Sequence, residues 1–138
     1  MKRTGTLVQN LPRGIIFLAG VVTGCAMTGE GLAIRLQAAI PDGGMGAWFG
    51  SAFFNGMGWT AGRIGWVLVL EGIFWVAAMV AWGARNRWGW WSAAAAGAIS
   101  LAFFPGGTLA GLVVLALMIP VLARERPWKA AREKSTEA

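Results

Sequence analysis

Long apolar runs constrain the fold of this chain more than any other feature. Residues 64–84 and 88–123 are almost continuously apolar, and the second run is broken mainly by a Pro-Gly-Gly triplet at 105–107. Only 13% of the residues are charged, whereas soluble domains carry about a quarter. Runs of this length and composition are typical of transmembrane helices. The sequence therefore predicts an all-α membrane protein whose 138 residues form a single membrane domain.

Four hydrophobic segments are expected to cross the bilayer. The segments are residues 14–34, 64–84, 88–104 and 108–123, and a tail follows at residues 124–138. As helices the third and fourth segments each extend about 25 Å, slightly less than a hydrocarbon core of ~30 Å. They are expected to form a hairpin, because Pro105 cannot continue the third helix and the glycines that follow it accept a positive φ.

The basic residues predict the orientation of these segments. Ten of the 12 Lys and Arg residues precede the first segment, separate the second from the third, or lie in the tail: Lys2, Arg3, Arg13, Arg85, Arg87, Arg124, Arg126, Lys129, Arg132 and Lys134. Because Lys and Arg are enriched on the cytoplasmic side, four crossings place both termini in the cytoplasm, beneath a bacterial inner membrane. These residues are expected to contact the lipid bilayer and not nucleic acid, since Glu125, Glu133 and Glu137 interrupt the basic tail.

The first outer loop, residues 35–63, is rich in glycine and aromatic residues and nearly uncharged. One helical face can collect Trp48, Phe49, Ala52, Phe53 and Gly56. One interpretation is a short helix lying in the outer membrane interface. The other is a re-entrant or partner-covered segment, since irregular backbone is tolerated in a membrane only where protein covers it. The side chains expected to contact the interface or a partner are Trp48, Phe49, Phe53 and Trp59.

Cys25 allows two interpretations of the first segment. Residues 1–25 have a basic start, continue with the apolar stretch GIIFLAGVV and end in VTGC. This ending resembles the lipobox of bacterial lipoproteins, which implies cleavage before Cys25 and lipidation of that cysteine. Alternatively, the segment is an uncleaved span in which Cys25 is a small packing residue. The apolar character of residues 26–34 favours the span, because these residues complete its length.

Two glutamates fall inside the predicted spans. Glu30 lies in the outer end of the first segment, and Glu71 lies about 10 Å below the outer boundary of the second, so that similar depths are expected. Intramembrane carboxyl groups usually face a bundle interior or a cavity, where they carry a proton or hold a cation. A structural alternative is that Glu30 reaches the interface or pairs with Arg35 or Arg63. Glu71 is the stronger candidate, and its helical face carries Leu68, Trp75, Ala78 and Trp82.

Small residues recur at the four-residue spacing that lets membrane helices approach closely. The residues in these stripes are Gly20, Gly24, Ser92, Ala96, Ser100, Gly107 and Gly111. Their usual role is packing within a bundle. Four thin helices enclose little interior, however, so a homo-oligomer or a larger membrane complex is also expected.

The residue inventory excludes most enzymes and cofactor sites. The chain has no His, no Tyr and one Cys. It therefore lacks the commonest haem ligand and cannot build the usual Cys/His zinc site. Nucleophile pairs of the Ser-His or Cys-His kind are excluded as well. No enzymatic activity and no cofactor or metal are expected.

The stretch GARNRWGWWSAAAAGAISLAFFPGGTLAGLVVLALMIPVL, residues 83–122, combines a basic and Trp-rich turn, an apolar helix, an FP-x-GT turn and a last helix that begins with glycine. In this order of features it resembles small bacterial four-helix inner-membrane proteins. The resemblance implies an architecture and no activity. A glutamate in the first of four helices is also found in small multidrug transporters, but their short loops and tyrosines are missing here.

Two functional hypotheses follow. The first is a small accessory subunit that packs against a larger membrane complex through its small-residue stripes and aromatic loop. The second is a small ion- or proton-coupled transporter or channel that uses Glu71 and Glu30. The transporter hypothesis predicts that the two carboxyl groups face each other across a wet interior. The accessory hypothesis predicts that they pair with arginine or turn to the interface.

Overall fold

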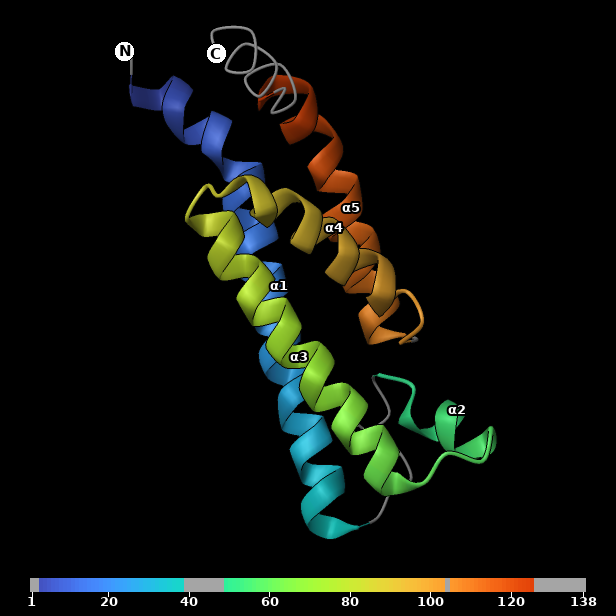
Figure 1. The fold of residues 1–138 in the computed structure, drawn as a ribbon. Helices are drawn as coiled ribbons and strands as arrows, with labels where there is room; N and C mark the ends of the chain where they lie inside the picture. Colours follow the sequence, from blue (N-terminus) through green and yellow to red (C-terminus); the bar gives the residue numbers. More distant parts are fainter. Residues whose placement is uncertain (1–2, 39–48, 104, 126–138) are drawn as a thin grey trace, which may run out of the picture.

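The computed structural model describes residues 3–38, 49–103 and 105–125 (Figure 1). In these ranges the chain forms helices joined by turns and no β-strand, so the predicted all-α class is confirmed for them. The helices are α1 (Arg3–Gln37), α2 (Ser51–Gly56), α3 (Ala61–Gly83), α4 (Arg87–Ser100) and α5 (Gly106–Glu125). Trp48, one of the predicted contact residues of the first loop, lies outside the described residues.

The number of helices suited to crossing a membrane is three in the described ranges, not the four predicted. These spans are Asn10–Gln37 in α1, Ala61–Gly83 in α3 and Gly106–Arg124 in α5. The remaining long helix, α4, has 14 residues. At ~1.5 Å per residue α4 measures about 21 Å, which is too short for a hydrocarbon core of ~30 Å.

α4 is shorter than the predicted segment 88–104 because its last turn tightens. The amides of residues 101–103 each donate to the carbonyl three residues earlier, at 3.3, 3.1 and 2.9 Å. Bonds of this kind form a 3₁₀ turn, which is common at helix ends. Pro105 reinforces the stop, since proline lacks an amide hydrogen and disfavours a helical conformation in the residue before it. The Thr108 hydroxyl donates to the Leu101 carbonyl across this turn at 2.9 Å.

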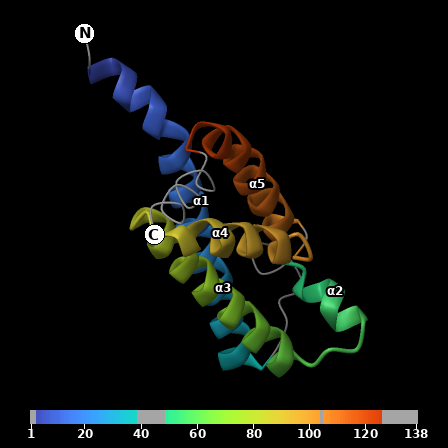
Figure 2. The ribbon, with the colours of Figure 1, turned by 45° about the horizontal axis from the view of Figure 1, so that its top comes forward.

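α1 and α3 form a long antiparallel pair, and the α4–α5 hairpin packs against it (Figures 1 and 2). α4 follows α3 and packs on it, while α5 packs on α4 and α1. The hairpin returns the chain to the end of the molecule at which α1 begins (Figure 1). This end, called the basic end below, carries Arg13, Arg85 and Arg124. The opposite end, called the loop end, carries Arg35 and Arg63.

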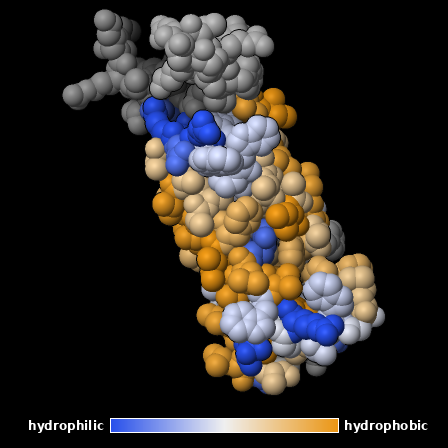
Figure 3. All heavy atoms as spheres, in the orientation of Figure 1, coloured by the Kyte–Doolittle hydropathy of each residue, from blue (hydrophilic) through white to orange (hydrophobic). Residues whose placement is uncertain are grey.

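The described helices are apolar on much of their outer surface. Figure 3 shows hydrophobic residues over most of the middle of one face and hydrophilic residues mainly toward its ends. Leu18, Leu70 and Val80 are 64%, 61% and 62% exposed. An apolar exterior on three long helices is the pattern of a protein whose solvent is lipid.

Glycines set the register of the α1–α3 pair. A Cβ atom on Gly24 would lie 2.7 Å from the Gly72 carbonyl oxygen, and one on Gly31 would lie 2.6 Å from the Gly65 carbonyl oxygen. The two backbones therefore meet at two points that are seven residues apart on each helix. Small residues drive helix pairing in membranes because they permit this close approach, whereas burying apolar side chains gains little when the solvent is lipid.

The predicted small-residue stripes lie at helix contacts, with one exception. A Cβ atom on Gly20 would lie 2.5 Å from the Cγ atom of Met79 on α3 and would also meet its sulfur. Within the hairpin, a Cβ atom on Gly111 would lie 2.8 Å from the Ser100 hydroxyl oxygen. The buried small residues of the hairpin include Gly89, Ala93, Ala96, Gly97, Ser100, Gly107 and Gly111. The exception is Ser92, whose hydroxyl donates to a carbonyl of its own helix at 2.8 Å.

The helical face predicted for the first loop is wrong at Phe49. The α2 helix begins only at Ser51, because Gly50 adopts a left-handed conformation with a φ of 74°. Phe49 is 7% exposed and Phe53 is 64% exposed, so the two side chains do not share a face. A left-handed residue is easily adopted by glycine and interrupts a helix at that point.

The α2 helix packs between α3 and the turn of the α4–α5 hairpin (Figure 2). The Phe54 ring centroid lies 5.5 Å from that of Phe103 in the turn and 5.2 Å from that of Trp59. Ser51 is completely buried. The first loop thus covers the hairpin turn, and Trp59 remains 38% exposed beside it.

α1 runs without interruption through Cys25, whose side chain is exposed. Residues before Cys25 make contacts with α3, among them Gly20 with Met79 and Arg13 with Trp82. Cleavage before Cys25 would remove these contacts. The uncleaved span is therefore the interpretation that the packing favours, and lipidation of Cys25 stays a prediction.

Candidate functional site

Both glutamates predicted to lie in the membrane are buried. Glu30 is 9% exposed and Glu71 is 7% exposed. They lie on the sides of α1 and α3 that face the bundle interior, where Met27 and Leu68 are 0% and 1% exposed. The residues predicted to share the face of Glu71 are all buried: Leu68, Trp75, Ala78 and Trp82.

The glycine contacts fix the relative heights of the two carboxyl groups. In this register Glu71 is level with Cys25 of α1, and Glu30 is level with Trp66 of α3. The two Cα atoms are therefore offset by five residues, or about 7–8 Å along the helix axes. The prediction that Glu30 and Glu71 lie at similar depth is therefore corrected by about 7–8 Å. Glu71 is the one nearer the middle of the bundle.

Helix direction brings the two side chains closer than their Cα atoms. A helical side chain leans toward the N-terminus of its own helix. α1 runs from the basic end to the loop end and α3 runs back. Glu30 therefore leans toward the level of Glu71, and Glu71 leans toward the level of Glu30.

Several buried polar atoms on this interior face lack a hydrogen-bond partner among the described residues. These atoms are Oε1 and Oε2 of Glu30, Oε1 of Glu71 and Nε1 of Trp75. Trp75 follows Glu71 by one helical turn and is completely buried. Buried polar groups are bonded in the large majority of cases. Their concentration on one face marks a polar site inside an otherwise apolar core.

Neither predicted arginine partner pairs with a glutamate. The Arg35 guanidinium carbon lies 4.7 Å from the centroid of the Trp66 ring, on which it stacks. Arg63 is exposed in the first turn of α3. The pairing of Glu30 with Arg35 or Arg63 is therefore wrong. The side chain of Arg35 packs along Gly65 instead. A Cβ atom on Gly65 would lie 2.7 Å from the Cγ atom of Arg35.

The start of α2 approaches Glu30 from the loop end. The Ser51 side chain and the Phe49 backbone both interact with the Glu30 carboxyl group. Neither contact is a well-formed hydrogen bond to Oε1 or Oε2 of Glu30. The first loop therefore supplies weak polar contacts to Glu30, while Glu71 lies deeper, beyond Met27 and Leu68.

Large apolar side chains close the interior on the other side of Glu71. Toward the basic end the core contains Trp75, Met79 and Trp82, which are 0%, 0% and 1% exposed. Glu30 therefore lies in the half of the bundle nearer the loop end, and Glu71 lies near the middle.

A pair of carboxyl groups in an apolar interior can exchange a proton or share a cation. The Ser51 hydroxyl adds a neutral oxygen near Glu30. Among the described residues no group of three or more His, Cys, Asp or Glu side chains could hold a metal ion. Two carboxyl groups and one hydroxyl group are suited to a proton or a weakly held cation.

The sequence did not reveal two members of this site. Trp75 was placed on the Glu71 face, but its unpartnered indole nitrogen is visible only in the packed structure. Ser51 lies in a loop whose register with α1 no sequence pattern encodes. The one available signal was the adjacent Gly50, which marks the break before α2.

A separate feature is an apolar groove on the outer side of the α1–α3 pair, with a volume of about 590 Å³. It is lined by Cys25, Thr28, Gly29, Leu32, Ile73, Val76 and Ala77. A Cβ atom on Gly29 would meet nothing within 4 Å. The groove therefore has room for a side chain from a neighbouring helix.

Comparison with known proteins supplies no identity for this arrangement. The chain matches no known protein family, and neither a curated protein nor a solved structure is significantly similar to it.

Proposed function

We propose that this protein is a small proton- or cation-coupled carrier of the bacterial inner membrane, with its basic end, where α1 begins and α5 ends, on the cytoplasmic side and with Glu30 and Glu71 as the ion-carrying groups. The observation that carries the proposal is the burial of both carboxyl groups on one interior face without an arginine partner. An intramembrane carboxyl group without a structural partner is costly, and its usual explanation is transport.

The positions of the two groups support a carrier over an open channel. Glu30 lies near the loop end, in contact with the start of α2. Glu71 lies deeper, and Trp75 and Trp82 close the interior beyond it. An ion that enters from the loop end would reach Glu30 first and Glu71 second. Passage to the basic end would then require movement of the packed helices, which is the alternating-access behaviour of carriers.

Flux measurements on purified protein in liposomes test this function. A pH-sensitive dye inside the vesicles reports proton movement when a membrane potential is imposed, and parallel experiments use Na⁺ and K⁺ gradients. Wild-type protein is expected to carry one of these ions, and the Glu30→Gln/Glu71→Gln double variant is expected to match protein-free vesicles. The proposal fails if wild-type flux never exceeds that of protein-free vesicles under any of these gradients.

The second candidate is an accessory subunit of a larger membrane complex, which the apolar groove at Gly29 favours. Its lining includes the small residues Cys25 and Ala77, the type that admits a transmembrane helix from another subunit. This candidate predicts no flux from the pure protein. It also predicts a stable foreign chain in the native mass spectrum of protein extracted gently from its own membrane.

A further inference from the structure

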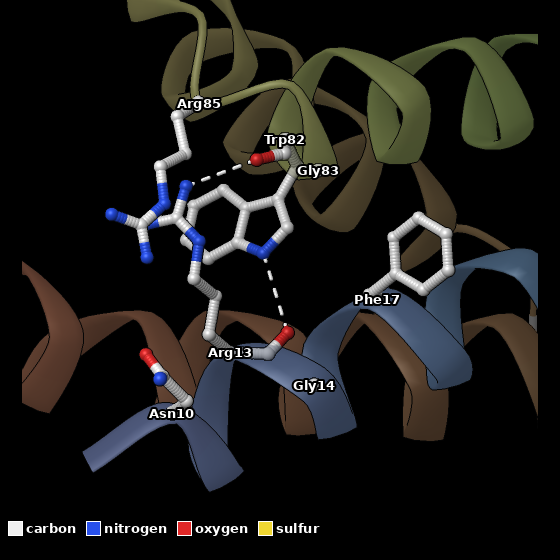
Figure 4. A pocket seen from close by; sticks show the side chains of 7 residues that line it. All are labelled: Asn10, Arg13, Gly14, Phe17, Trp82, Gly83 and Arg85. Carbon is white, nitrogen blue, oxygen red and sulfur yellow. Dashed lines mark hydrogen bonds between the residues drawn. The ribbon is translucent and has the colours of Figure 1, made fainter. Parts of the chain in front are cut away.

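A second polar site lies at the basic end, far from the two glutamates. A cavity of about 300 Å³ opens between the first turns of the α1 span and the end of α3. It is lined by Asn10, Arg13, Gly14, Phe17, Trp82, Gly83 and Arg85. Figure 4 shows the Arg13 and Arg85 side chains projecting toward the same region beside the Trp82 ring.

Arg13 is held in place by Trp82. Its Nη2 atom donates to the Trp82 carbonyl at 3.0 Å, and the Trp82 Nε1 atom donates to the Arg13 carbonyl at 3.4 Å (Figure 4). The guanidinium carbon also lies 4.8 Å from the centroid of the Trp82 ring. Stacking and hydrogen bonding together fix the position of this guanidinium group before any ligand arrives.

The same Trp82 carbonyl positions the second arginine. The Arg85 amide donates to it at 3.1 Å, and the Asn86 amide donates to the Ala81 carbonyl at 3.2 Å. These two bonds are those of a Schellman motif, which ends a helix with one residue in the left-handed conformation. That residue is Arg85, with a φ of 54°. Glycine is the usual residue at this position because it adopts a positive φ without strain.

An arginine at a strained glycine position, beside a second arginine, calls for an explanation beyond capping. The negative end of the helix dipole accommodates one cation at the α3 terminus. The Arg85 side chain is exposed, and the two acidic side chains that the structure describes, Glu30 and Glu71, are buried in the interior and away from it. Two converging guanidinium groups are the usual recognition element for a phosphate, which accepts paired hydrogen bonds from their planar forks.

We propose that Arg13 and Arg85 bind the phosphate group of an anionic phospholipid at the basic end of the molecule. The cavity lies where the apolar parts of α1 and α3 end, which is the depth of lipid headgroups. Leu18 and Val80, one to two turns farther into the apolar region, are 64% and 62% exposed and are suited to contact with acyl chains. A phospholipid can contact both the two arginines of the cavity and the apolar surface beside it, whereas free phosphate can contact only the arginines.

Arg85→Gly tests the proposal without endangering the fold, because glycine suits the left-handed position. The matched control is Arg87→Gln, which removes the same charge two residues away. Arg87 stacks over Trp88 with its guanidinium carbon 5.5 Å from the ring centroid, and it does not line the cavity. The assay counts phosphatidylglycerol and cardiolipin molecules retained on the protein in native mass spectrometry, with zwitterionic phosphatidylcholine, which has no net charge, as the reference.

We expect Arg85→Gly to lower anionic-lipid binding by about tenfold, the usual effect of losing one charge-assisted hydrogen bond. Arg87→Gln is expected to bind as wild type does, and millimolar inorganic phosphate is expected not to displace the lipid. Equal losses in both variants would overturn the proposal in favour of a diffuse basic surface. Displacement by inorganic phosphate would overturn it in favour of a soluble-anion site. The test is independent of the proposed transport function.

Discussion

The Glu71→Gln protein is expected to lose ion flux by at least about tenfold and to keep or gain thermal stability. Glutamine preserves the size of the side chain but can neither carry a proton nor hold a cation as a carboxylate does. Stability is expected not to fall, because a neutral group is less costly to bury than a charge without a partner. The two measurements are flux in proteoliposomes and thermal unfolding in detergent.

Two further variants sharpen this result. Glu30→Gln is expected to reduce flux less than Glu71→Gln, because Glu30 lies nearer the loop end and contacts Ser51 and Phe49. Glu125→Gln changes an acid at the last residue of α5 and serves as the control. A loss of stability with unchanged flux in Glu71→Gln would show that the carboxyl group is structural and would contradict the proposal.

Gly72→Leu is expected to lower the free energy of unfolding strongly. A Cβ atom at this position would lie 2.5 Å from the Gly24 carbonyl oxygen and 2.7 Å from the Thr28 amide nitrogen. The obstacles are backbone atoms of α1, which cannot rotate away as a side chain would. We expect a loss of at least about 3 kcal/mol in the free energy of unfolding, the upper part of the range for overpacked cores.

The matched control is Gly29→Leu, which adds the same side chain to α1, the other helix of the pair. Because a Cβ atom on Gly29 meets nothing within 4 Å, this variant is expected to unfold as wild type does. Stability is measured by titration with a denaturing detergent, followed by tryptophan fluorescence. Equal stability of the two variants would contradict the close approach of α1 and α3.

The sequence predicted the long helices well, because they depend on local composition. The apolar runs located α1, α3 and α5, and helical periodicity placed Glu71 on the buried face with Leu68 and Trp75. The pairing of α1 with α3 was not predicted. Gly31, Gly65 and Gly72 lie at the contacts, yet with 21 glycines in the chain no spacing rule distinguishes these three.

The predictions from the sequence were wrong where tertiary contacts outweighed the local sequence pattern. Arg35 was predicted as a partner for Glu30, but a guanidinium group also stacks on aromatic rings, and the register places Trp66 beside it. The expected crossing at residues 88–104 fails because a 3₁₀ turn ends α4 at Ser100. The six-residue α2 was overextended in the prediction because the left-handed conformation of Gly50 is not encoded by periodicity.

Glu30 and Glu71 are proposed to face one interior site, and cross-linking measures whether their positions are close together. In a Cys25→Ser background, which removes the single native cysteine, the pair Glu30→Cys/Glu71→Cys is treated with a short bismaleimide in membranes. The control pair is Glu30→Cys/Ile73→Cys, since Ile73 is 54% exposed on another face of α3. We expect an intramolecular cross-link, seen as one added linker mass on the monomer with no free thiol remaining, for the first pair only. Cross-linking of the control pair alone, or of neither pair, would contradict it.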